Sequence, residues 1–190
     1  MDSIEYVELG ANAGRGNLLG IQPVMSERDY ATDEAFYAKL DGYMRQAASH
    51  GWLGSRTIVV WPEYVGVWLA STGERAAATL AGTMQNVALA HLPRFIAALL
   101  TSREKNRMNA AIFRTQAEAM ARSYQAAFSR LAREYAVTVV GGSILLPAPS
   151  VQGGRVMAGK GALQSVSAVF RPDGTPYPFL VRKAFPTAGE

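Results

Sequence analysis

The sequence lacks cysteine altogether, and among its 190 residues it has only two histidines, His50 and His91. The missing cysteines exclude disulfide bonds, thiolate metal sites and a thiol nucleophile within these residues. Two histidines so far apart in the chain do not indicate a metal site. We therefore expect no metal and no other cofactor.

Long apolar runs are absent as well. The longest, from Asn86 to Leu100, is interrupted by a histidine, a proline and an arginine and is too short to cross a bilayer. Residues 1–20 include three acidic side chains and lack the basic start and apolar centre of a secretory signal. These absences predict a soluble, cytoplasmic protein with no membrane partner.

A strong charge of one sign is also missing. The 19 basic residues exceed the 15 acidic ones by only four, and they are scattered along the chain. Proteins that bind nucleic acid concentrate basic side chains in a stripe, with aromatic residues between them. The sequence therefore predicts no nucleic-acid partner.

What the sequence does have is 49% hydrophobic residues, enough for one sizeable core. No repeat or linker divides it, so we expect a single domain over residues 1–190, with residues 1–16 as an N-terminal extension. Strand-like and helix-like segments alternate, which predicts an α/β fold with a mixed sheet. The expected strands are 17–25, 57–61, 137–147, 165–170 and 178–185, with a flexible loop over 148–162 and a turn at 172–175. The expected helices are 32–49, 76–100 with a break near Pro93, and a long helix to Tyr135 that begins at a capping box over Thr101–Glu104.

Two charged residues lie at strand ends. The run TIVVW (57–61) is apolar at consecutive positions, as in a strand covered on both faces, and Glu63 follows it. Lys183 lies in the same way near the end of the last strand. Single charges at such places are usually solvated, but sites in α/β sheets gather at the carboxyl ends of strands. Tyr64 either contacts substrate or packs, and Ser143 lacks the nucleophile-elbow pattern of a serine hydrolase.

Five motifs follow one another in an order typical of one family. They are GIQPV (20–24), VVWPEYVG (59–66), LAREYAVTVVGGS (131–143), VSAVFRPDGT (166–175) and VRKAFPTAGE (181–190). On these motifs, the chain from Leu18 to Glu190 resembles the N-terminal part of the nitrilase superfamily, the carbon–nitrogen hydrolases.

The resemblance implies an α-β-β-α sandwich, incomplete in this chain, and a Glu-Lys-Cys catalytic triad. By motif, Glu63 corresponds to the general base and Lys183 to the lysine that stabilises the tetrahedral intermediate. Glu190 falls where the family has a second structural or catalytic glutamate. The cysteine nucleophile is expected beyond this chain. The resemblance also implies a homo-oligomer and makes 73–100 a helical insertion, which is either a cap over the pocket, an oligomer contact or a simple surface elaboration.

Two functions stay open at this point. The first is hydrolysis of a non-peptide carbon–nitrogen bond in a small molecule, with amide, nitrile and carbamoyl substrates all possible and a PT-x-x-E ending that looks more like the nitrilase branch. The alternative is a catalytically inactive fragment or relative that acts in binding or assembly.

Overall fold

The structure is a computed structural model that describes residues 5–11, 13–73 and 80–184. Its helices are α1 (Asp33–Ser49), α2 (Leu80–Ala90), α3 (Leu92–Thr101) and α4 (Arg107–Glu134), with 3₁₀ turns η1 (Glu27–Tyr30) and η2 (Val67–Ser71). Its strands are β1 (Asn17–Gly20), β2 (Thr57–Val60), β3 (Thr138–Val140), β4 (Ile144–Pro147), β5 (Ser150–Gln152), β6 (Arg155–Met157), β7 (Leu163–Phe170) and β8 (Pro176–Arg182).

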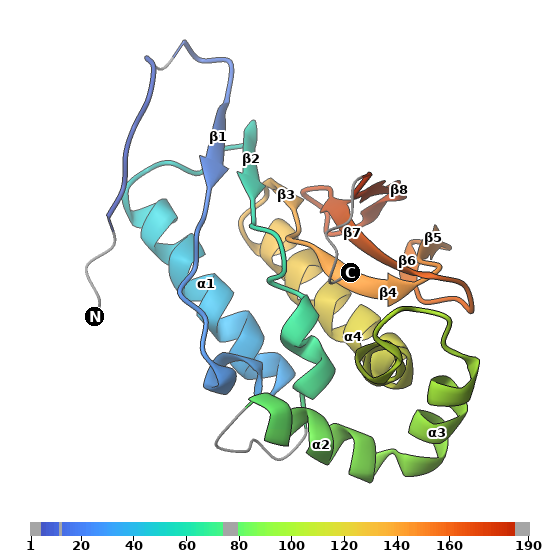
Figure 1. The fold of residues 1–190 in the computed structure, drawn as a ribbon. Helices are drawn as coiled ribbons and strands as arrows, with labels where there is room; N and C mark the ends of the chain where they lie inside the picture. The colour runs from blue at the N-terminus through green and yellow to red at the C-terminus, as the bar shows by residue number, and fades with distance from the viewer. Residues whose placement is uncertain (1–4, 12, 74–79, 185–190) are drawn as a thin grey trace.

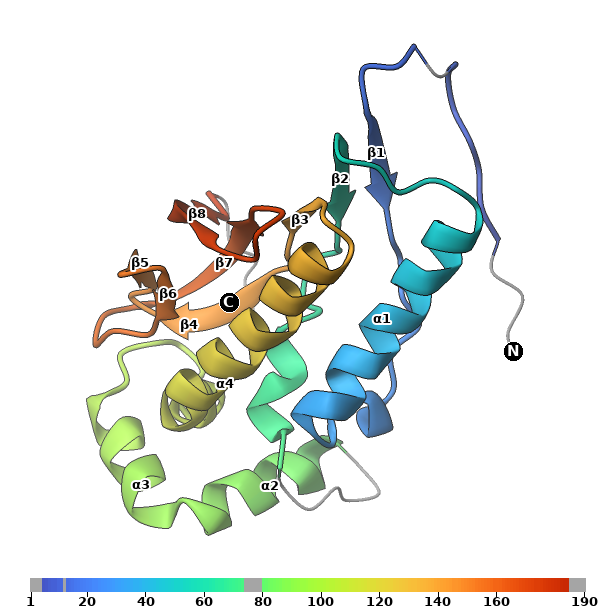
Figure 2. The same cartoon turned by 180° about the vertical axis from the view of Figure 1, so that it is seen from behind.

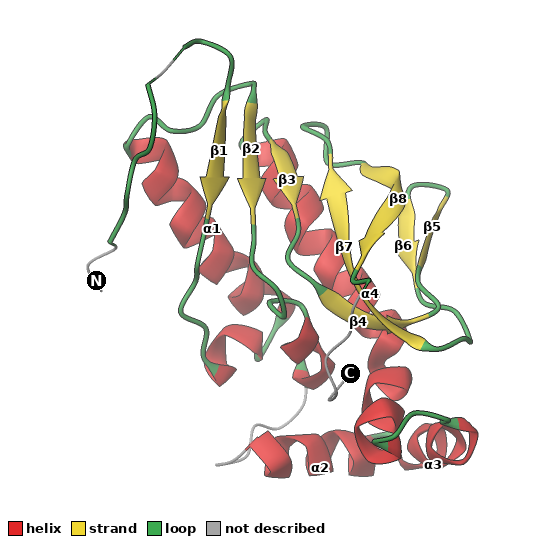
Figure 3. Ribbon diagram, turned by 45° about the horizontal axis from the view of Figure 1, so that its top comes forward, coloured by secondary structure: helices red, strands yellow, loops and turns green. Residues whose placement is uncertain are grey.

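Six of these strands form one mixed sheet, which confirms the predicted α/β class. The path is β1-β2-β3-β7-β4, and β8 also pairs with β7. Strands β1, β2 and β3 are parallel, whereas β7 runs antiparallel to β3, β4 and β8. Figure 3 shows the parallel strands on one side and β7 with its partners on the other.

Helices α1 and α4 cover one face of this sheet and enclose the core (Figures 1 and 2). The predicted helix over 32–49 is confirmed, because Thr32 Oγ1 caps α1 by accepting a hydrogen bond from the Ala35 amide at 3.0 Å. Spacing by four residues places one apolar stripe of α1 against the sheet. The side chains with no exposed surface include Phe36, Leu40 and Met44 of α1, Met120, Tyr124 and Phe128 of α4, and Val59, Val139 and Phe170 of the strands.

The other face of the sheet is apolar and partly exposed. On β2, Val59 is buried, while Ile58 and Val60 are 38% and 37% exposed. The prediction that this strand is covered on both faces is therefore wrong for the described residues. A run of apolar residues shows that a strand is hydrophobic, but it does not show that both of its faces are buried. We call this surface the open face; its exposed members are Leu18, Ile58, Val60, Phe179 and Val181.

The boundaries of the central helices differ from the prediction. Thr101 is the last residue of α3, and its hydroxyl donates back to the Ala97 carbonyl at 2.9 Å, so the capping box at Thr101–Glu104 is wrong. Helix α4 begins instead after Asn106, whose side chain accepts from the Asn109 amide at 3.1 Å. The break near Pro93 is confirmed between α2 and α3, while residues 76–79 lie outside the described ranges. None of the described helices is long and apolar enough to span a membrane.

Two predictions about the later strands are also wrong. The expected strand 137–147 is two strands, because residues 141–143 leave the ladder between β3 and β4. The expected flexible loop 148–162 contains the hairpin β5-β6, which turns at Gly153 and Gly154 with positive φ angles of 55° and 73°. Gln125 of α4 holds this hairpin through the Gly154 carbonyl and the Val156 amide. The turn over 172–175 is confirmed, with the Gly174 amide donating to the Arg171 carbonyl.

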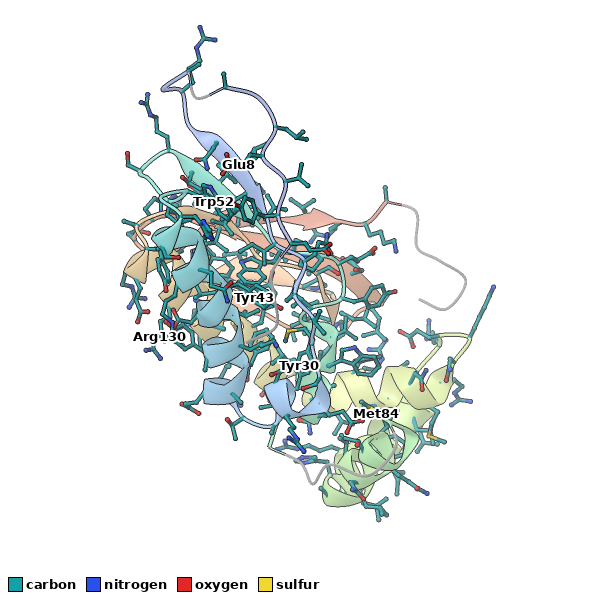
Figure 4. The ribbon with its side chains drawn as sticks, turned by 90° about the vertical axis from the view of Figure 1, so that its left-hand side faces the viewer. Glu8, Tyr30, Tyr43, Trp52, Met84 and Arg130 are labelled. Carbon is teal, nitrogen blue, oxygen red and sulfur yellow. The ribbon has the colours of Figure 1, made fainter. Side chains whose placement is uncertain are left out.

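The described part of the N-terminal extension lies against the end of α1. Trp52 Nε1 donates to Glu8 Oε1 at 2.5 Å, and the two side chains are labelled in Figure 4. Tyr6 packs on the rings of His50 and Trp52. These contacts attach the extension to the domain.

The core makes one sharp stability prediction at Tyr124. Its buried hydroxyl accepts the Ala168 amide at 3.1 Å, so Tyr124→Phe leaves that amide unpaired and should lower the free energy of unfolding by about 1–3 kcal/mol. Tyr43→Phe is the matched control, because its hydroxyl accepts the Val24 amide at an exposed site that water can satisfy. Urea unfolding of both variants measures the difference, and equal losses would contradict this account.

Candidate active site

Backbone hydrogen bonds join the segment after β2 to residues 140–143, where the chain passes from β3 to β4. The Trp61 amide donates to the Val140 carbonyl at 3.0 Å, and the Ser143 amide donates to the Pro62 carbonyl at 3.3 Å. On the far side of Glu63, the Gly66 amide donates to the Ser143 carbonyl at 3.0 Å. Glu63 therefore lies in a short loop that is fixed at both ends.

Tyr64 gives this loop its sharp turn. Its φ angle is 67°, in the left-handed region that side chains other than glycine rarely adopt. The Tyr64 amide donates to Ser143 Oγ at 2.8 Å, which helps to hold this conformation. Strained backbone of this kind persists where the surroundings fix it, and it is common at functional sites.

Close backbone approach explains the glycines before Ser143. A Cβ on Gly142 would lie 2.2 Å from both the Pro62 carbonyl oxygen and Val65 Cγ1. Only glycine lets the two loops meet at this distance. The role of Ser143 as the residue that positions the Glu63 loop was missed from the sequence, although the break itself was signalled by the pair of glycines in VVGGS.

Tyr30 of η1 supports the same loop from the other side. Its hydroxyl is buried and donates to the Val65 carbonyl at 2.9 Å. Burial raises the pKa of Tyr30 above its ordinary value, and the nearby Asp29 carboxylate adds to this shift. The hydroxyl therefore stays protonated and keeps its role as donor.

Lys183 meets Glu63 across the ends of β8 and β2. The Lys183 amide extends the ladder with β7 by donating to the Ser165 carbonyl at 3.0 Å. Its Nζ lies 2.7 Å from Glu63 Oε1 and 5.8 Å from the centre of the Tyr64 ring. The structure thus brings Glu63, Tyr64 and Lys183 together, whereas Glu190 lies outside the described residues.

Glu63 lines two adjoining hollows. The apolar pocket, of about 450 Å³, lies between η1, η2 and the loop after β2; its walls include Pro23, Met25, Tyr30, Tyr64, Val65 and Trp68. The polar pocket, of about 220 Å³, contains Lys183 together with Ser143, Ser165 and Ser167. The carboxylate therefore lies where an apolar hollow and a polar one meet.

This arrangement can move a proton and stabilise an anion. The side chain of Glu63 is 50% exposed and that of Lys183 24%, so both charges are reachable and partly neutralise each other. A carboxylate in such a place can accept a proton from a nucleophile, and a fixed ammonium group can stabilise negative charge on a reacting oxygen. Among the described residues, no cluster of acidic or histidine side chains could hold a metal ion.

Comparison with known proteins assigns the chain to no family. The chain matches no protein-family model, and no curated protein is significantly similar to it. Evidence for a function lies in the geometry of the site and in the order of the motifs.

The close approach at Gly142 predicts a large effect of a single methyl group. Gly142→Ala should lower the free energy of unfolding by about 1–3 kcal/mol, because the added Cβ would overlap the loop that carries Glu63. Gly42→Ala is the control: nothing lies within 4 Å of its added Cβ in the middle of α1, so it should be neutral or stabilising. Thermal unfolding of both variants tests this, and a neutral Gly142→Ala would contradict the packing described here.

The exposure of the Glu63–Lys183 pair predicts that it contributes little to folding. Lys183→Met should change the free energy of unfolding by less than about 1 kcal/mol, as for other solvated ion pairs. Arg114→Met should cost more, up to about 3–5 kcal/mol, because Arg114 and its partner Glu104 are each only 17% exposed. A loss at Lys183 as large as at Arg114, measured by urea unfolding, would mark the Glu63–Lys183 pair as structural.

Proposed function

We propose that this chain carries the base and the lysine of a nitrilase-type carbon–nitrogen hydrolase. The observation that carries the proposal is the contact between Lys183 Nζ and Glu63 Oε1 at 2.7 Å, made by two residues that lie 120 positions apart at the ends of different strands. The order of the five motifs supports it. Glu63 acts as general base, and Lys183 stabilises the tetrahedral intermediate.

In this proposal the nucleophile is a cysteine that lies beyond residues 1–190. Glu63 accepts the thiol proton as sulfur bonds to the amide or nitrile carbon. Charge that develops on the amide oxygen or nitrile nitrogen is stabilised by the Lys183 ammonium. For an amide, the carbon–nitrogen bond breaks, the proton held by Glu63 passes to the leaving amine, and water then hydrolyses the thioester. For a nitrile, the proton held by Glu63 passes to the nitrile nitrogen as the thioimidate forms. One water then adds and ammonia leaves, which gives the thioester, and a second water hydrolyses that thioester.

The open face supports the sandwich architecture that belongs to this function. Exposed apolar side chains such as Ile58, Val60 and Val181 suit the packing of a second sheet. Ser167 pairs with Val181, so it lies on the same face, and both residues line the polar pocket beside Lys183. The site thus lies where two packed sheets would meet, which would exclude water from the reaction.

The remaining features of the proposal concern the assembly. Thr83 of α2 lines the apolar pocket, which supports a capping role for the helical insertion over 73–100. A cytoplasmic homo-oligomer is part of the same proposal. The alternative is a non-catalytic relative that acts in binding or assembly, in which the Glu63–Lys183 pair performs no chemistry.

The test uses the protein that joins residues 1–190 to the segment with the expected cysteine. Glu63→Gln and Lys183→Ala should each lower ammonia release from small amides or nitriles by about 10²–10³-fold or more, because each removes a group that acts in the transition state. Glu118→Gln and Lys160→Ala, at exposed positions away from the site, are the matched controls and should have no effect.

The outcomes separate the two functions. Normal turnover in Glu63→Gln or in Lys183→Ala removes that residue from the mechanism. If the gene encodes no cysteine at the end of a strand after residue 190, the catalytic proposal is wrong and the non-catalytic alternative is left.

A further inference from the structure

The apolar pocket beside Glu63 has a composition that selects among possible ligands. Its volume of about 450 Å³ lies in the range of small-molecule sites. Aromatic and aliphatic side chains form most of the wall, and the half-buried Trp68 provides its largest flat surface. A hollow with such walls favours an apolar ligand group, because a polar group would lose its hydrogen bonds to water without gaining new ones.

The walls are also fixed before any ligand arrives. The Tyr30 hydroxyl is engaged with the Val65 carbonyl, so this tyrosine presents its ring rather than a free polar group. Val65 is buried and lies in the loop that Ser143 holds. A preformed apolar wall binds a rigid ring at little cost in conformational entropy.

The charges around the pocket have one sign. Its charged lining residues in the described part of the chain are Glu27 and Glu63, and no lysine, arginine or histidine lines it. Lys183 lies in the polar pocket and reaches the apolar one only at its edge, through Glu63. A carboxylate inside the hollow would therefore meet negative charge and apolar surface without a cation to pair with, whereas one at the junction would lie beside Lys183.

We infer that the apolar pocket binds an uncharged aromatic or branched aliphatic group of the substrate and places the attached amide or nitrile carbon beside Glu63 and Lys183. This inference rests on the proposed function for the identity of the reacting group. The apolar part of the ligand fills the hollow between η1 and η2. The polar end then lies at the junction of the two pockets.

Binding to the 190-residue chain tests the inference without any turnover. The probes are phenylacetamide, acetamide, which lacks the ring, and 4-carboxyphenylacetamide, whose negative charge lies on the ring. Isothermal titration should show phenylacetamide binding about 10–100-fold more tightly than acetamide, because one buried ring contributes that difference. Phenylacetamide should also bind more tightly than 4-carboxyphenylacetamide, because the carboxylate on that ring would enter the hollow without a cation to pair with. Equal binding of acetamide, or equal binding of 4-carboxyphenylacetamide, overturns the inference.

Two variants locate the binding. Ala31→Trp places a large side chain in the hollow, and Trp68→Leu removes its aromatic wall; each should weaken phenylacetamide binding about tenfold or more. Ala126→Trp, at an exposed position of α4, is the control and should bind like the wild type. Unchanged binding in either folded pocket variant, with folding checked by circular dichroism, places the ring elsewhere and overturns the inference.

Glu63→Gln separates this inference from the proposed function. The variant should still bind phenylacetamide more tightly than acetamide, because the apolar wall is intact, while turnover in the longer protein is lost. Selective binding together with normal turnover would overturn the catalytic proposal alone. Lost turnover without selective binding would overturn the pocket inference alone.

Discussion

The site depends on one set of hydrogen bonds, those between Ser143 and the loop that carries Glu63. Ser143 donates its amide to Pro62, accepts the Tyr64 amide on its hydroxyl and accepts the Gly66 amide on its carbonyl. These bonds hold an unfavourable turn at Tyr64 and leave Gly142 no room for a side chain. The break that splits the expected strand 137–147 is therefore what positions the carboxylate. Regular pairing through residues 141–143 would fill the place of the loop.

The pair of Glu63 and Lys183 is more exposed than the pair of Arg114 and Glu104. Each residue is carried by a different strand, so their meeting depends on the whole sheet being assembled. Each also keeps exposed surface, and together they divide an apolar hollow from a polar one. In the proposed function the carboxylate and the ammonium group both act on a third molecule, so a substrate must reach each of them. The surface that they keep exposed is where it would do so.

Local signals in the sequence predicted local structure well. Helix α1 followed from Thr32 and the spacing of Phe36, Leu40 and Met44, and the turn at 172–175 followed from its proline and glycine. The start of α4 was misplaced because Glu104 is drawn to Arg114, a contact that the sequence does not show. The hairpin β5-β6 looked flexible because its order comes from Gln125 on a distant helix. The positions of Glu63 and Lys183 at strand ends could be predicted from the sequence. The two hollows could not, since each is lined by at least three segments that lie far apart in the chain.

Strand β7 has a consequence for the order in which the chain folds. Strands β3, β4 and β8 all hydrogen-bond to it, and two of them precede it in the chain. During synthesis, α4, β3 and β4 therefore leave the ribosome before the strand that joins them exists, and the apolar stripe of α4 has only part of its cover. The pairings of β7 with β3 and β4 nevertheless join residues 16 to 31 positions apart, whereas β2 pairs with β3 across 80 residues, and pairings over long separations are the slow ones to form. Because Glu63 follows β2 and Lys183 follows β8, their contact needs the local pairings around β7 and the long-range pairing of β2 with β3.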